Sequence, residues 1–216
     1  GPPAPRVARR EIPVGLAQVE NQILPSQGYV YAIRFVVDKP TRVWRFFSGF
    51  NLEGTPRLGG RNGYARGNGG TIRAKLVRVD RRGRPRMRSV IASERVNAVR
   101  RYLQTKSSYG LGRRRSQMIY FNMRGVRLAP NRMYAMTYQN VSRSPRRNYF
   151  STDSPTIKES EAGPNGRNNL NRLAARPVAG LDPREAVAWS RDRGRSWVWG
   201  RRVGEGRIVG TYPGSR

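Results

Sequence analysis

Segments in which apolar and polar residues alternate constrain the fold of this chain more than any other feature. The clearest is TIRAKLVRVD, residues 71–80, in which Ile72, Ala74 and Leu76 share one side and Arg73 and Lys75 the other. A period of two residues is typical of a β-strand with one buried and one solvated face, whereas a helix repeats every ~3.6 residues. The alternation therefore predicts a strand here.

Stretches rich in β-branched and aromatic residues predict further strands. YVYAIRFVVD (29–38) stops at a Lys-Pro pair and RVWRFFSGF (42–50) follows it directly, so we expect two adjacent strands. The remaining candidates are SVIASERV (89–96), QMIYFNM (117–123), RMYAMTYQNV (132–141), EAVAWS (185–190) and WVWGRRV (197–203). Convincing amphipathic helices and fixed-period repeats are missing. The pattern predicts an all-β chain, an antiparallel β-sandwich of jelly-roll type.

The length of 216 residues fits a single domain. Residues 1–28 have weak periodicity and are expected to form an extended N-terminal arm, and residues 29–216 to form one sandwich domain. Within it, the Asn-, Gly- and Ser-rich segment 152–184 is expected to be a long loop and 185–203 a hairpin.

The charge of the chain predicts an anionic partner. Lys and Arg number 43 against 13 Asp and Glu, a net charge of +30, and residues 96–149 contain no acidic residue. Such a field repels itself and attracts polyanions. The first candidate is an anionic polysaccharide or another cell-surface polyanion. Nucleic acid bound by a virion-like structural protein is the alternative, and self-assembly through the N-terminal arm is a third.

Basic residues concentrate in loops between the predicted strands, where tyrosines lie near them in sequence. Arginine binds carboxylate, sulfate or phosphate with a bidentate fork, and tyrosine stacks on sugars or bases. The candidate ligand-binding residues are Arg81, Arg82, Arg84, Arg113, Arg114, Arg115, Arg146, Arg147, Tyr64 and Tyr109.

The residue types that are absent argue against several kinds of chemistry. Without Cys or His the chain has no disulfide, no zinc site of Cys or His type and no Cys or His nucleophile. The acidic pairs Glu159 with Glu161 and Asp182 with Glu185 lie in polar segments. We therefore expect a non-catalytic protein without metal or cofactor, and without a transmembrane segment because no apolar run approaches about 18 residues.

Two glycine-containing motifs are interpreted as turns. In GYARGNGG (63–70) no third glycine follows at the spacing of a dinucleotide-binding loop, so the cluster predicts a turn into a strand. SRDRGRSW (190–197) fits the Asp-box pattern S-x-D-x-G-x-[ST]-W and resembles the hairpin turns of that name. Ser190, Asp192, Gly194 and Trp197 take the pattern's places, and we expect a structural role for them.

The segments GYARGNGGTIRAKLVRVD, VRLAPNRMYAMTYQNV and RRNYFSTD have a spacing that resembles secreted jelly-roll domains of GC-rich bacteria, of lectin-like or carbohydrate-binding-module-like kind. The resemblance spans about residues 29–153. It implies a sandwich that binds a glycan and an extracellular or cell-surface location, although the opening GPPAPRVARREIP has no signal-peptide apolar region.

Overall fold

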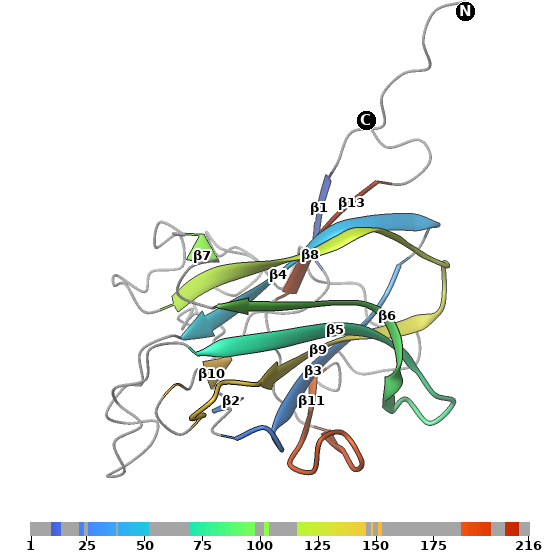
Figure 1. The fold of residues 1–216 in the computed structure, drawn as a ribbon. Coiled ribbons are helices and arrows are strands. Elements are labelled where there is room, and N and C mark those ends of the chain that lie inside the picture. The colour runs from blue at the N-terminus through green and yellow to red at the C-terminus, as the bar shows by residue number, and fades with distance from the viewer. Residues whose placement is uncertain are drawn as a thin grey trace, which may run out of the picture.

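In a computed structural model of the chain, every regular element among the described residues is a β-strand. The structure describes residues 10–13, 22–23, 26–37, 39–51, 70–97, 102–103, 116–145, 148, 151–152, 187–199 and 206–211. The strands form two antiparallel sheets that lie as two layers (Figure 1). The predicted all-β sandwich is confirmed, and the finer jelly-roll assignment stays a prediction.

Sheet A is organised around one long strand, and its two longest strands form the upper layer in Figure 1. Its strands are β1 (Arg10–Pro13), β2 (Gln22–Ile23), β4 (Thr41–Asn51), β7 (Tyr102–Leu103), β8 (Ser116–Leu128), β10 (Ser151–Thr152) and β13 (Gly206–Thr211). The central strand β4 pairs with β8, β10 and β13, and β1, β2 and β7 extend the sheet from these neighbours.

Sheet B, the lower layer, contains six described strands in the order β12-β11-β3-β9-β5-β6. Their bounds are β3 (Val30–Val36), β5 (Thr71–Val79), β6 (Pro85–Asn97), β9 (Met133–Asn140), β11 (Val187–Ser190) and β12 (Val198–Trp199). Strands that are distant in sequence thus become neighbours, because β9 lies between β3 and β5.

The core lies between the two sheets and is aromatic at its centre. Phe35 and Tyr138 project from sheet B, and Phe46 and Phe121 project from sheet A. The Tyr138 ring lies with its centroid 5.3 Å from that of Phe121. Burying each of these side chains stabilises the fold by about 1.5–3 kcal/mol. Burial also raises the pKa of the Tyr138 hydroxyl, so this core stays uncharged.

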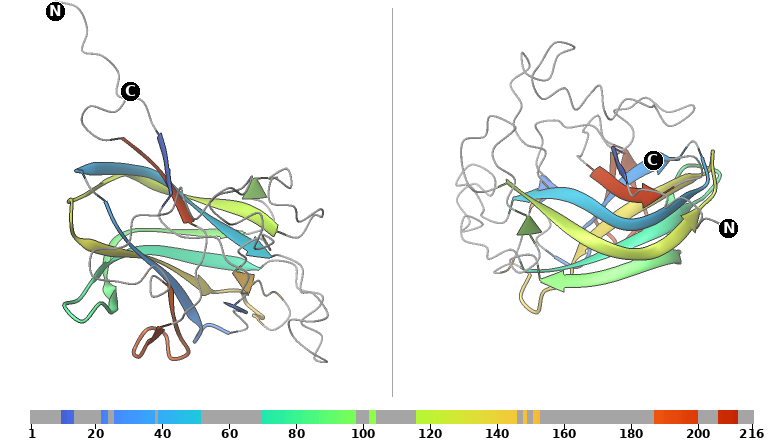
Figure 2. Two further views of the ribbon diagram at one scale, coloured as in Figure 1. Left: turned by 180° about the vertical axis from the view of Figure 1, so that it is seen from behind. Right: turned by 90° about the horizontal axis from the view of Figure 1, so that it is seen from above.

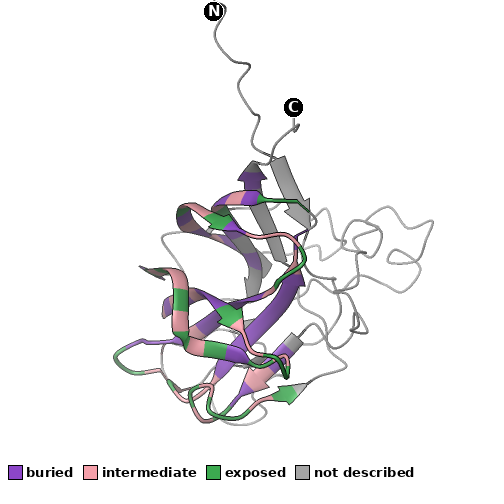
Figure 3. Ribbon diagram, turned by 90° about the vertical axis from the view of Figure 1, so that its right-hand side faces the viewer, coloured by how far each residue is buried: buried purple, intermediate pink, exposed green. Residues whose placement is uncertain are grey.

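The outward-facing side of sheet B is also buried in its middle. Ala32 and Arg34 of β3, Val77 of β5 and Ala135 of β9 are all buried, although they alternate with the core residues. The β5–β6 hairpin bends at this place, where its pairing register shifts on either side of Val77. Figure 3 shows exposed and intermediate residues alternating along this hairpin and buried ones behind it.

The structure corrects several details of the predicted strands. The segments around 29–38 and 42–50 form β3 and β4, but these strands belong to different sheets, because the Lys39-Pro40 interruption takes the chain from one layer to the other. The strand expected over 89–96 is longer, since β6 already begins at Pro85 and runs to Asn97. The segment expected as an arm contributes β1 and β2 to sheet A.

Candidate functional site

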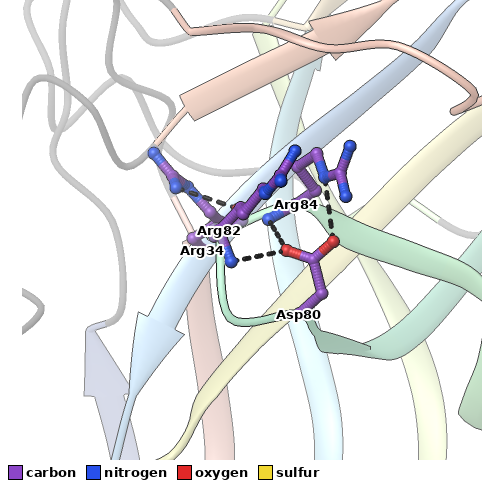
Figure 4. Close-up of polar contacts among 5 residues, drawn as sticks. Arg34, Asp80, Arg82 and Arg84 are labelled. Carbon is purple, nitrogen blue, oxygen red and sulfur yellow. Dashed lines mark hydrogen bonds and ion pairs between the residues drawn. The ribbon is translucent and has the colours of Figure 1, made fainter.

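The turn between β5 and β6 is held closed by the side chain of Asp80. Its Oδ1 accepts hydrogen bonds from the backbone N–H groups of Arg82 and Arg84, both at 2.9 Å, and its Oδ2 accepts one from Arg84 Nε at 2.8 Å (Figure 4). Gly83 supplies the left-handed backbone conformation, with φ of 81°. Partial burial acts to raise the pKa of Asp80, but the bonds from Arg84 and Arg82 outweigh it and hold the pKa below 3.8.

The same turn is attached to sheet B through a buried arginine. Arg34 of β3 is 2% exposed, and its Nη1 donates a hydrogen bond of 3.0 Å to the carbonyl oxygen of Gly83. A Cβ atom on Gly83 would lie 2.7 Å from this nitrogen, so only glycine permits the approach. Arg34 therefore fixes the turn over the outward face of sheet B and adds a positive charge beneath it.

The turn between β11 and β12 is a second compact structure, closed by Asp192. Asp192 Oδ1 accepts hydrogen bonds from Ser190 Oγ at 2.6 Å and from the Ser196 N–H at 2.9 Å. Its Oδ2 accepts a further bond from Ser196 Oγ at 2.5 Å, and Ser190 Oγ accepts one from the Gly194 N–H at 2.7 Å. Bonds from the Ser190 hydroxyl, then from the Ser196 hydroxyl and N–H, lower the pKa of Asp192 well below 3.8. Both carboxylates are thus ionised and engaged within their own turns.

The second turn lies against β6 just beyond the first turn, although about a hundred residues separate the two turns in the sequence. Gly194, with φ of 87°, lies so close to Met87 of β6 that an added Cβ would collide with the Met87 side chain. The Arg193 N–H donates a 2.8 Å hydrogen bond to the carbonyl oxygen of Gly28, which anchors the second turn near the start of β3. The views in Figures 1 and 2 agree in placing both turns at the outer side of sheet B.

Exposed arginines lie in both turns and in the first part of β6, next in sequence to this contact. We call them the two-turn surface: Arg81, Arg82, Arg84, Arg86, Arg88, Arg191, Arg193 and Arg195. Only Asp80 and Asp192 lie among them in sequence. Arg84 pairs with Asp80, and the Arg84 side chain is nevertheless 48% exposed. The surface is therefore strongly cationic, and guanidinium groups face solvent.

The structure tests the location of only some of the predicted ligand residues. Arg81, Arg82 and Arg84 belong to the two-turn surface, whereas Tyr64, Tyr109, Arg113, Arg114, Arg115, Arg146 and Arg147 lie outside the described residues. The sequence interpretation missed Arg191, Arg193 and Arg195, because the SRDRGRSW motif was interpreted only as turn chemistry. Arg34 was missed because it lies within an apolar strand. The sequence signal for the three turn arginines was their occurrence at every second position of SRDRGRSW.

The described residues form no metal centre of acidic side chains and no membrane-spanning helix. No protein-family model, curated protein or solved structure matches this chain. The Asp-box and lectin-like resemblances therefore stay predictions that rest on sequence motifs.

Proposed function

We propose that this protein is a non-catalytic binding protein for an anionic polymer, which it holds on the two-turn surface. The observation that carries the proposal is the packing of Gly194 against Met87, which joins two sets of exposed arginines into one surface. Eight arginines that repel one another are costly in the absence of a counter-charge. A bound polyanion supplies that counter-charge.

The chemistry of the surface favours recognition of acidic groups. Guanidinium forks bind sulfate, carboxylate or phosphate oxygens in pairs. Arg34 and the hydrogen bonds of Asp80 hold the first turn in place before the ligand arrives, which reduces the ordering cost of binding. An anionic glycan of the cell surface is the first ligand class, in line with the expected extracellular location. Nucleic acid bound through its phosphates is the alternative.

The carboxylates of the surface support a binding role over a catalytic one. Glycoside hydrolysis requires one carboxyl group that donates a proton and a second that acts as base or nucleophile. Asp80 and Asp192 instead accept hydrogen bonds from their own turns, and their pKa values are lowered, so neither is suited to donate a proton.

The proposal is tested by titrating a sulfated polysaccharide, single-stranded DNA and a neutral glucan at two salt concentrations. Counterion release should weaken binding of the anionic polymers about ten-fold or more between roughly 50 and 200 mM salt. The neutral glucan should bind weakly at both salt concentrations. The polymer that binds more tightly at the higher concentration identifies the ligand class.

A matched pair of double variants locates the site. Arg82→Ser with Arg193→Ser removes one charge from each turn, and Arg95→Ser with Arg143→Ser removes two exposed charges elsewhere. The first variant should reduce the slope of log affinity against log salt by about 1.5–2, more than the control does. Equal effects of the two variants would show that the net charge of +30 acts without a defined site.

A further inference from the structure

The outward face of sheet A carries a second group of arginines, which alternate with aromatic rings on β4 and β8. These strands lie side by side in the layer seen from above (Figure 2, right). The group, called here the β4–β8 face, consists of Arg42, Trp44, Arg45, Tyr120, Arg124 and Arg127. It belongs to the opposite layer from the two-turn surface, and nothing in its geometry depends on that surface.

Each ring of the β4–β8 face has a guanidinium over it. Arg45 Cζ lies 4.7 Å from the centroid of the Tyr120 ring, and Arg42 Cζ lies 5.9 Å from that of Trp44. A guanidinium that is stacked in this way keeps its N–H groups in one plane and loses little rotamer freedom on binding an anion. The rings thus pre-arrange two anion-binding groups.

A bulge in β8 shapes this face around Trp44. The register of β4 and β8 shifts between Val43 and Arg45, and Arg124 and Gly125 take left-handed conformations with φ of 57° and 73°. A Cβ atom on Gly125 would lie 2.8 Å from the Trp44 ring. The indole therefore lies directly against the backbone of the bulge. A non-glycine residue in the left-handed region is strained, and such strain is concentrated at functional sites.

The two strands β4 and β8 supply no counter-charge of their own to this face. Arg42 and Arg127 are directly opposite each other in the register, an arrangement of like charges that destabilises a strand pair. Neither β4 nor β8 contains Asp or Glu. Glu94 of β6 contacts this strand pair, because its carboxylate accepts hydrogen bonds from the Asn122 N–H and side chain. An anion bound between these arginines would relieve the repulsion.

We propose that the β4–β8 face is a second binding site, and that it takes single-stranded nucleic acid. A sheet surface that offers rings and guanidinium planes beside cationic groups matches the way unpaired bases stack while the phosphates pair with arginine. A paired duplex presents phosphates but keeps its base faces stacked inside. An acidic glycan without stacking bases would use the arginines alone.

The test uses fluorescence anisotropy with a labelled oligothymidylate of about 12 nucleotides. Inorganic polyphosphate serves as a competitor that has charge but no bases. Tyr120→Leu removes the support of Arg45 for both ligands but the stacking surface only for the oligonucleotide, so oligothymidylate affinity should fall about 5-fold or more beyond the loss seen for polyphosphate, since base stacking contributes about 1–3 kcal/mol per base. Tyr120→Phe keeps the ring and should bind like the wild type. Arg45→Gln should weaken both ligands and reduce the salt slope, and Arg143→Gln serves as its exposed control.

Photo-crosslinking gives a second readout that does not depend on any variant. Irradiated oligothymidylate should attach to peptides from β4 or β8, mapped by mass spectrometry. Crosslinks confined to other peptides would overturn the proposal. An equal loss of oligothymidylate and polyphosphate affinity in Tyr120→Leu would also overturn it, because the ring would then only support Arg45. Failure of the two-turn variants would leave these results unaffected, so the two proposals fail separately.

Discussion

Single polar side chains determine the shape of both turns in the two-turn surface. Asp80 and Asp192 each accept hydrogen bonds from backbone and side-chain donors of their own turn. A carboxylate with several donors is more stable ionised than protonated, which is why both pKa values are lowered. The geometry of the cationic surface therefore depends on two negative charges.

Replacing Asp192 by Ala should lower the melting temperature at neutral pH by about 3 °C, since the turn loses several acceptor bonds. The pKa of Asp192 is lower in the folded protein than in the unfolded chain, where it has the ordinary value of 3.8. Its contribution to stability is therefore fully present above pH 3.8 and is lost as the pH falls through the folded-state pKa. The difference in melting temperature between wild type and variant should thus shrink below about pH 4.

Thermal melts of both proteins over this pH range provide the measurement. Arg195→Ala changes the neighbouring exposed side chain and should leave the pH dependence intact. A difference that stays constant down to the acid limit would show that the carboxylate of Asp192 does not carry the stabilisation.

At the scale of elements, β6 joins the two layers as well as closing sheet B. The Glu94 side chain of β6 accepts a hydrogen bond from the backbone N–H of Asn122 in β8. A side chain of sheet B thus pairs with a backbone group of sheet A. This contact holds the β5–β6 hairpin against sheet A at one end. Arg34 and Gly83 hold it against sheet B at the other.

Glu94→Ala should destabilise the protein by about 1–3 kcal/mol, because it leaves the Asn122 N–H without its acceptor. Glu94→Gln retains an acceptor oxygen and should cost less. Urea unfolding measures both, and hydrogen exchange at the Asn122 amide should accelerate in Glu94→Ala. Ser93→Ala, at an exposed neighbouring position, is the control. Equal stability of Glu94→Ala and the wild type would mean that the contact between sheets is dispensable.

The sequence predicts the longest strands well and the contacts between distant elements poorly. TIRAKLVRVD is recognisable because β5 faces the core on one side and stays partly solvated on much of the other. The short strand β1 pairs with β13, which lies nearly two hundred residues away in the sequence and also pairs with β4. The packing of Gly194 against Met87 is equally non-local, so alternation and turn chemistry cannot reveal it.

At the scale of the whole molecule, the described cationic groups are distributed over both layers. Exposed arginines lie on the turns of sheet B and on the outward face of sheet A. The net charge of +30 therefore opposes compaction throughout the fold. Screening by salt should relieve part of this repulsion, because the Debye length falls from about 30 Å at 0.01 M to about 8 Å at 0.15 M.

We accordingly expect the melting temperature to rise as sodium chloride increases from about 20 to 300 mM. Differential scanning calorimetry measures the shift. A sulfated polysaccharide should produce a similar rise at a much lower concentration, because it binds the folded state. A melting temperature that is constant or falls with salt would show that the charges are already compensated within the fold.

The position of β6 has a consequence for colloidal behaviour. Among the described strands β6 pairs with β5 alone, so it is the long terminal strand of sheet B. Such an edge invites another copy to add a strand, and the arginines along β6, at positions 86, 88 and 95, discourage this by repulsion. Neutralising these charges with a polyanion removes the repulsion. The conditions that raise the melting temperature are therefore also those under which the protein is most prone to aggregate.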